Sequence, residues 1–204
     1  MTITNGYATR DDIKNALRIP LSDTQDDDLI DVAVESASRE IDGYCERVFY
    51  STSETRVYIP QSSFLVETDD ISTLTTLKTS PDGEEFSVTW AESDRQLEPL
   101  NGIAGGLTTP FTRIRAIGDY LFPIWDPRNV NAHEATVQVT GTFGWTATPK
   151  AVEQACILLS MRLFKRLDAP LGAVGFGDIG VVRVSRIDPD IESLLAPYRR
   201  VRMA

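Results

Sequence analysis

The spacing of hydrophobic positions predicts two helices within the first 50 residues. The longer one runs from residues 22–24 to about Tyr44, because apolar residues recur there at spacings of three and four. These residues are Leu29, Ala33, Ala37, Ile41 and Tyr44, with Ile30 and Val34 widening the face. The shorter helix begins at Thr9, whose hydroxyl is followed three residues later by an acid, and it ends at Pro20.

Beyond Thr55 the pattern changes to short segments rich in β-branched and aromatic residues, bounded by turn residues. Two of these segments alternate polar and apolar residues, as expected of a sheet with one buried face. Six short strands in this region predict a small antiparallel β-barrel or sandwich. The predicted strands are residues 56–59, 64–67, 74–79, 86–90, 111–117 and 135–141. Residues 101–109 and 123–133 lack a strand pattern, and we predict loops there.

Helical spacing returns at Thr148, a capping residue followed by proline at the first helical position. This helix extends to about Leu167 and is apolar around most of its circumference. A surface helix of a monomer is more polar, so we expect cover on two sides, by its own core and by the β-region or another subunit. A final helix begins with Asp188 as N-cap and Pro189 at its first position.

These patterns predict an α+β protein, in which a helical bundle carries an inserted small antiparallel β-barrel or sandwich. The two N-terminal helices occupy residues 1–50 and the β-domain residues 51–148. Residues 149–170 form the core helix, and residues 171–204 comprise a glycine-rich arm, a short strand and the C-terminal helix with its tail.

Charge is distributed unevenly along this chain of 204 residues, whose net charge is −10. Residues 1–50 and 51–148 have net charges of −6 and −7, whereas residues 149–204 have a net charge of +3. Nucleic-acid readers concentrate positive charge on their main face, so this arrangement favours contact between the basic tail and an acidic neighbouring copy. We expect no membrane span and no signal peptide, and two cysteines that are buried thiols.

No arrangement of residues indicates catalysis. The single histidine, His133, lies beside Glu134, and such a neighbouring pair is common by chance. The sequence also lacks the G-x-S-x-G elbow of hydrolases and a G-K-[ST] phosphate loop. The glycines of residues 172–180 follow a helix and precede a strand, which is the reverse of a dinucleotide loop. We therefore predict no enzyme, no cofactor and no metal. The acids Asp26, Asp27 and Asp28 lack the alternation of a calcium loop and complement a helix start.

The glycine-rich arm, residues 171–180, is too apolar for a solvated linker. It gains stability only when something covers it, either a neighbouring subunit or its own chain. The strand predicted for residues 181–187 has the composition to pair with an open sheet edge.

Several segments resemble the head-tail connector (adaptor) proteins of tailed phages, the gp6-like and gp15-like family, particularly those of phages that infect actinobacteria. They are YATRDDIKNAL near the N-terminus, residues 26–50, QLEPLNG at residues 96–102, GTFGWTATPKAVEQACILLSMRLFKRLDAPLG and RIDPDIESLLAPYRR. The β-region matches only weakly, and it is the order and spacing of the motifs that make the resemblance specific.

The resemblance implies a structural virion protein, a dodecameric ring beneath the portal that extends the DNA channel and joins capsid to tail. Its partners are the portal protein, further copies of itself and a stopper or tail-side neck protein. Double-stranded DNA passes through without specific binding. The protein is made in the host cytoplasm and resides in the virion neck.

Surface chemistry placed on this architecture identifies candidate sites. Residues predicted for portal or intersubunit docking are Leu171, Val174, Phe176, Ile179, Arg183, Arg186, Tyr198, Arg199, Arg200 and Arg202. Asp26, Asp27 and Asp28 are candidate acids of the channel lumen, where they would repel passing phosphates. Two alternatives stay open, a stopper or tail-completion protein of the same neck and a small cytoplasmic protein whose β-domain binds a ligand.

Overall fold

The computed structural model describes residues 2–81, 84–124, 135–168 and 188–200. Its contacts divide the chain into two compact units. One unit combines residues 1–47 with residues 148–204, and the other consists of residues 48–147. The β-rich stretch therefore interrupts a helical unit whose two parts are distant in sequence.

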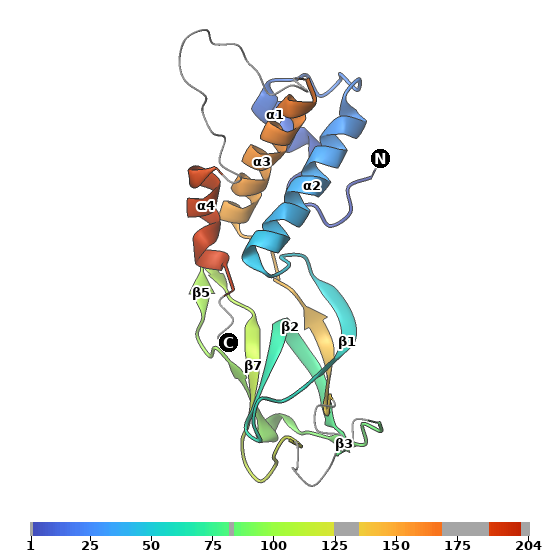
Figure 1. The fold of residues 1–204 in the computed structure, drawn as a ribbon, viewed down its shortest axis with the longest axis vertical. Helices are drawn as coiled ribbons and strands as arrows, with labels where there is room; N and C mark the ends of the chain where they lie inside the picture. Colours follow the sequence, from blue (N-terminus) through green and yellow to red (C-terminus); the bar gives the residue numbers. More distant parts are fainter. Residues whose placement is uncertain (1, 82–83, 125–134, 169–187, 201–204) are drawn as a thin grey trace. The chain divides into compact units, whose positions relative to one another are not determined.

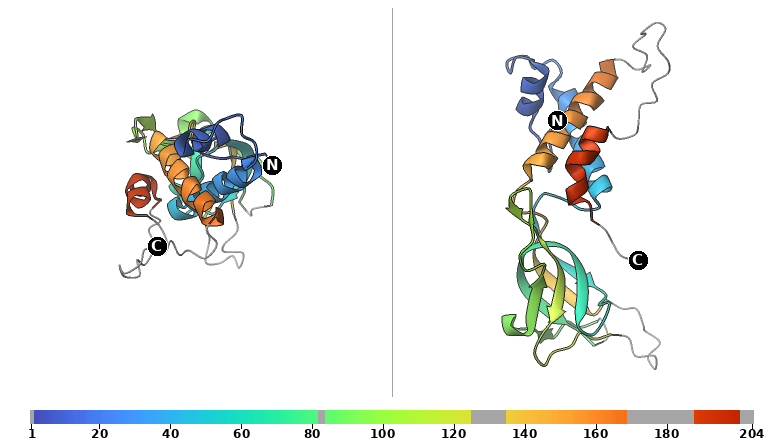
Figure 2. Two further views of the ribbon diagram at one scale, coloured as in Figure 1. Left: turned by 90° about the horizontal axis from the view of Figure 1, so that it is seen from above. Right: turned by 90° about the vertical axis from the view of Figure 1, so that its left-hand side faces the viewer.

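The helical unit consists of α1 (Arg10–Leu17), α2 (Asp27–Cys45), α3 (Lys150–Asp168) and α4 (Pro189–Leu195), followed by a 3₁₀ turn at Ala196–Tyr198. Helices α1, α2 and α4 all contact α3, and Figures 1 and 2 show them grouped around it. The apolar faces that the spacing predicted for the two long helices meet in this core. Its buried side chains include Ile13, Ile30, Val34, Ile41, Val152, Leu159, Ile191 and Leu195.

Helix boundaries follow local capping chemistry. Thr9 caps α1 in a reciprocal box with Asp12, and the Asp188 side chain accepts a hydrogen bond from the backbone N–H of Asp190, as predicted for both helix starts. The predicted start of α2 at residues 22–24 was wrong. The helix begins at Asp27, because a turn linking Asp23 to Pro20 occupies the preceding residues.

The β-unit contains a six-stranded antiparallel sheet with the order β1-β8-β2-β7-β4, and β3 pairs with β2. The strands are β1 (Thr52–Tyr58), β2 (Leu65–Thr79), β3 (Val88–Thr89), β4 (Arg95–Glu98), β7 (Phe111–Ala116) and β8 (Val137–Phe143). A 3₁₀ turn at Glu92–Asp94 precedes β4. Strands β5 (Ile103–Ala104) and β6 (Leu107–Thr108) form a separate hairpin.

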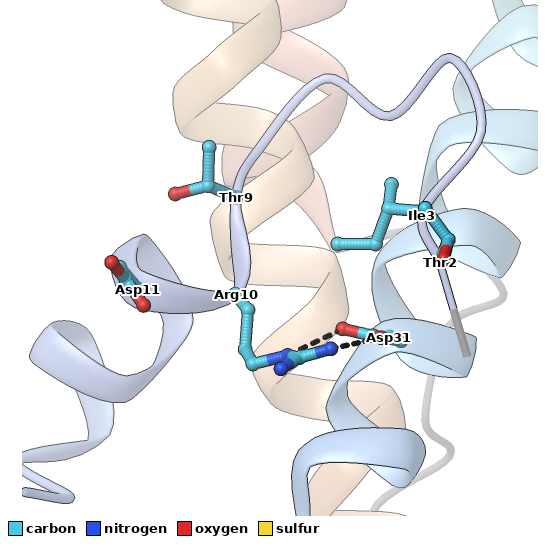
Figure 3. Close-up of a pocket in the computed structure, with 6 residues that line it drawn as sticks. All are labelled: Thr2, Ile3, Thr9, Arg10, Asp11 and Asp31. Atoms are coloured by element: carbon cyan, nitrogen blue, oxygen red, sulfur yellow. Dashed lines mark hydrogen bonds and ion pairs between the residues drawn. The ribbon is translucent and has the colours of Figure 1, made fainter. Parts of the chain in front are cut away.

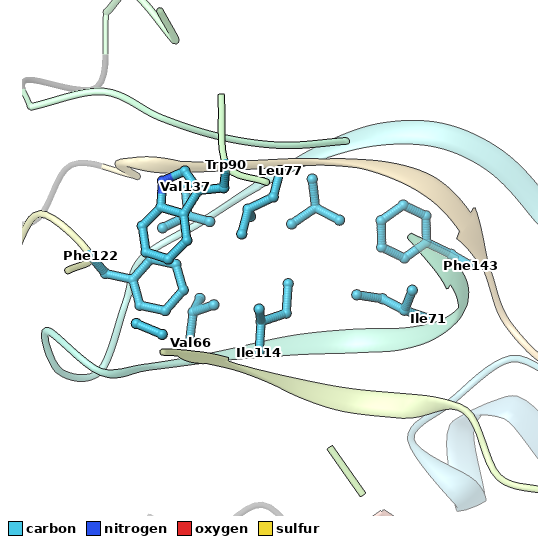
Figure 4. Close-up of a cluster of buried hydrophobic side chains, with 10 residues drawn as sticks. Val66, Ile71, Leu77, Trp90, Ile114, Phe122, Val137 and Phe143 are labelled. Atoms are coloured by element: carbon cyan, nitrogen blue, oxygen red, sulfur yellow. The ribbon is translucent and has the colours of Figure 1, made fainter. Parts of the chain in front are cut away.

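A bend in β2 gives the sheet its core. The first part of β2 pairs with β7 and the last part pairs with β8, with register shifts between Glu67 and Ile71 and again between Ile71 and Thr76. The two halves of the sheet thereby face each other across Val66, Ile71, Leu77, Ile114, Val137 and Phe143 (Figure 4). Trp90 stacks on Phe122 with 4.6 Å between ring centroids and closes one end of this core.

The structure confirms the α+β class and corrects its details. The strand path ends at β1 and β4, which do not pair with each other among the described residues, so the predicted barrel is not closed. The predicted strands 64–67 and 74–79 are one continuous strand, β2. Residues 101–109 form a hairpin around Gly105 and Gly106, both with positive φ, where we predicted a loop.

The turn after β8 depends on Gly144. Its φ of 92° lies in the left-handed region, and a Cβ placed there would lie 1.9 Å from the backbone oxygen of Tyr50. The Gly144 N–H donates to the backbone oxygen of Asp70, and the indole N–H of Trp145 donates to the Asp70 carboxylate at 3.2 Å. The turn formed by Gly144 and Trp145 therefore locks β8 to the bend of β2.

Candidate assembly surfaces

The described part of the predicted docking tail is held by its own helical unit. Tyr198 is buried, at 4% exposure. The Arg199 guanidinium lies 5.7 Å from the centroid of the Tyr44 ring, and the backbone N–H of Arg200 donates to the carbonyl of Cys45 at 2.9 Å. The structure thus brings these three residues to the C-terminal end of α2. Only Arg199 and Arg200 present surface there.

The other predicted docking residues lie outside the described residues. They are Leu171, Val174, Phe176, Ile179, Arg183, Arg186 and Arg202. Their role stays a prediction, as does the strand at residues 181–187.

The acids at the start of α2 have different environments. Asp27 forms ion pairs with Lys14 and with Arg10, the latter at 2.8 Å. The hydrogen bond from Lys14, reinforced by the charge of Arg10, holds the pKa of Asp27 below its ordinary value. Asp26 occupies the N-cap position without a capping hydrogen bond from its side chain, and Asp28 is exposed. The helix-start interpretation of these acids agrees with this geometry.

Sequence reasoning missed the ion-pair network to which Asp27 belongs. The Arg10 side chain donates from Nε to Asp31 at 2.8 Å and pairs with the same carboxylate through a second nitrogen. Lys14 and Asp31 are both buried, and the Lys14 ammonium also donates to the backbone oxygen of Asp23 at 2.6 Å. The network fastens α1 to the start of α2. An acid in the middle of an apolar helix face, as Asp31 is, was the available signal.

A pocket of about 390 Å³ lies beside this network (Figure 3). It is lined by Thr2, Ile3, Thr9, Arg10, Asp11 and Asp31. The Arg10 guanidinium and the Asp31 carboxylate point toward each other there and satisfy one another. The arrangement stabilises the fold and offers no activated nucleophile.

Other chemical classes find no support among the described residues. Within those ranges no group of three or more potential ligands gathers to hold a metal ion. No helix in the described part of the chain is long and apolar enough to cross a membrane. Cys45 and Cys156 are buried free thiols, as predicted.

Large apolar side chains are exposed on both units. In the helical unit these are Leu21, Leu29 and Val32. In the β-unit they are Val57, Ile59, Phe64, Val88, Leu100, Ile103, Tyr120, Leu121 and Ile124.

Solved structures of neck particles share the fold. A chain in the neck of an empty GTA particle, computed with C6 symmetry, aligns with a TM-score of 0.59 at 15% identity, covering 100% of this chain and 95% of its own. A chain in the virion of a native gene transfer agent particle gives 0.57 at 17% identity, with the same coverage. A chain in the native neck, computed with C12 symmetry, gives 0.50 at 17% identity over 86% of this chain and 84% of its own. No curated protein has a sequence that matches this chain.

The sequence itself matches a family model. Residues 7–80 match the model described as phage gp6-like head-tail connector protein, a range that begins three residues before α1 and ends one residue after β2. This range contains the first two segments on which the predicted resemblance rested, and the resemblance is confirmed. Over these residues the chain is similar to the phage gp6-like head-tail connector family, and over its whole length its fold is similar to chains of GTA particles.

Proposed function

We propose that the protein is the head-to-tail adaptor of a phage virion, a ring beneath the portal that joins capsid to tail. The observation that carries the proposal is the family match over residues 7–80, which includes α1, α2 and all of β2. Similarity of fold to neck chains in particles computed with C6 and C12 symmetry supports a ring. The site of action is the virion neck, reached after assembly in the host cytoplasm.

The ring is a dodecamer whose partners are the portal protein on one side and a stopper or tail-side neck protein on the other. Its work is binding without turnover. In each copy the helical unit forms the frame, and the β-unit is its insertion. The proposed docking surface combines the arm at residues 171–179 with the basic tail, in which Arg199 and Arg200 flank the end of α2.

In this proposal the net negative charge of the chain keeps DNA from binding to the channel wall. Each phosphate that a protein neutralises adds salt-sensitive affinity for DNA, so a channel through which DNA slides benefits from negative walls. The net charge of −10 in every copy supplies such walls. Among the three acids proposed for the lumen, Asp27 is paired with Lys14 and Arg10, which offset its charge.

Mass photometry tests the proposal. Purified protein is measured alone and after mixing with tail-less capsids that carry the portal, prepared from the phage that encodes the chain. We expect ring-sized particles or saturable uptake at the portal vertex. A strict monomer that portal-bearing capsids ignore would overturn the adaptor assignment and favour a stopper position or a ligand-binding module. The origin from a phage of actinobacteria stays a prediction.

A further inference from the structure

We propose that a second copy of this chain docks on the outward face of α2 through the outward face of its own α3. The inference rests on the ring assembly proposed above and names the two surfaces that form the ring contact. The α2 surface is a seam of five exposed residues at spacings of three and four along the helix, the spacing of a helix-packing stripe. These residues are Leu29, Val32, Ser36, Arg39 and Gly43.

The α2 seam is apolar where it begins and lies opposite the face that packs into the core. Leu29 is 44% exposed and Val32 is 42% exposed. Leu21, which precedes α2 in the sequence, is also exposed. The residues that α2 buries in the core of its own unit include Ile30, Val34 and Ile41. Leu29 and Val32 therefore add nothing to the core, and their apolar surface gains stability only from a partner.

Gly43 gives independent support. Glycine inside a helix costs about 1 kcal/mol relative to alanine. A Cβ at Gly43 would meet nothing within 4 Å, so packing within this chain does not require a glycine there. Gly43 and Ser36 are the small residues of the seam, one on each side of Arg39, and small residues permit close approach of another helix. A partner backbone accounts for a glycine that the chain's own fold does not need.

The outward face of α3 has complementary chemistry. Gln154, Ile157, Leu158, Met161 and Lys165 recur there at helical spacing, and the three apolar residues among them are partly exposed. This face ends in the exposed cations Lys165 and Arg166. The α2 seam is flanked by Glu35 and Glu40, neither of which pairs with a cation of the described ranges. The apolar stripe of α3 thus ends in cations, and the apolar stripe of α2, whose own cation Arg39 pairs with Asp42, is flanked by acids.

The two faces lie where a ring contact needs them. Helices α2 and α3 lie side by side and contact each other (Figure 2), and because their buried sides form the shared core, we infer that their exposed faces lie on different sides of the helical unit. A contact between two different faces of one molecule is heterologous, and its repetition builds a ring where the rotation between neighbouring copies closes. A dimer would instead need one self-complementary face.

Charge reversal tests the pairing. Glu35→Lys/Glu40→Lys reverses the α2 flank, and Lys165→Glu/Arg166→Glu reverses the α3 end. Glu84→Lys/Glu85→Lys is the matched control, because it reverses two acids of a loop in the β-unit. Circular dichroism checks the fold of each variant, and mass photometry is run under the conditions in which wild-type rings form, alone or on portal-bearing capsids.

We expect each reversal alone to lower the ring fraction by about tenfold or more, because like charges then meet across the interface. An equal mixture of the two variants should restore rings of alternating copies, and the chain carrying both reversals should form rings by itself. Gly43→Phe should block assembly without unfolding the monomer, since a Cβ at this position meets nothing within 4 Å.

Failure of the inference differs from failure of the proposed function. Wild-type-like rings from both single reversals would overturn the pairing and leave the adaptor assignment intact. Rings that form normally but no longer bind capsids would overturn it too, by assigning the α2 seam to another neck protein. If the wild type itself stays monomeric with and without portal-bearing capsids, the ring proposal fails and the pairing fails with it.

Discussion

Gly144 is a residue whose replacement we expect the β-unit not to tolerate. Alanine there combines a disfavoured φ with a Cβ only 1.9 Å from the Tyr50 backbone oxygen, so the turn after β8 must move. We expect Gly144→Ala to lower the free energy of unfolding by about 2 kcal/mol or more in urea titrations. Gly43→Ala is the matched control with the opposite sign, since it relieves a helical glycine in open space. Equal effects at the two glycines would contradict this account.

The two thiols are predicted to be inert in the native state. Burial raises the pKa of Cys45 to about 12 and also raises that of Cys156, so neither forms thiolate near neutral pH. We expect Ellman's reagent at pH 8 to modify neither cysteine of the folded protein within minutes and both in urea. Rapid reaction of one native thiol would show that its helix opens on that timescale.

The ion pairs of Asp27 predict an acid-sensitive contribution to stability. Its pKa is lower in the folded state than its ordinary value of 3.8, so the contribution is present above that pH and is lost as pH falls through the folded pKa. We expect the urea midpoint to fall below pH 4 more steeply in wild type than in Lys14→Met, which lacks the main cause of the shift. Asp27→Asn should also lose the extra slope. Identical acid slopes in all three proteins would contradict the assignment.

At the scale of elements, the start of α1 depends on its cap. The Thr9 hydroxyl accepts from the Asp12 N–H at 3.2 Å, and the Asp12 carboxylate accepts from the Thr9 N–H at 2.8 Å. Thr9→Ala removes half of this box and should cost about 1 kcal/mol in the free energy of unfolding. Thr24→Ala, at an exposed threonine before α2, is the control and should change little. The measurement is urea denaturation followed by circular dichroism.

Elements set by local chemistry were predictable from the sequence, and those set by distant contacts were not. Thr9 and Asp188 act on neighbours within three residues, which is why both helix starts were correct. Strand β2 was divided in two because the polar pair Asp69-Asp70 interrupts its apolar pattern. Asp70 is buried there to accept from Gly144 and Trp145, partners more than 70 residues away. The Arg10–Asp31 pair escaped prediction for the same reason.

The hairpin of β5 and β6 is a different case, since its signal was present. Gly105-Gly106 is a dipeptide that favours tight hairpin turns, but strands of two residues with an exposed Ile103 lack the alternation that we used to identify sheets. In the helical unit, the exposed seam of α2 could likewise be identified only from the burial of each residue in the structure. Sequence periodicity locates the apolar residues of a helix, but it does not tell which of them pack in the core and which are left for a partner.

At the scale of the whole molecule, the charge of each copy determines how the proposed channel interacts with DNA. If the start of α2 lines the lumen, then Asp26→Lys/Asp28→Lys adds cations that attract the phosphates of passing DNA, and each phosphate contact adds salt-dependent affinity. We expect slower DNA ejection from virions that carry this variant, with the delay shrinking at higher ionic strength. Asp27→Asn is the control, because Asp27 is already engaged by Lys14 and Arg10 and its loss should lower stability without slowing ejection. Unchanged ejection by Asp26→Lys/Asp28→Lys virions of normal yield would remove these acids from the lumen, while leaving the ring and its α2–α3 contact untouched.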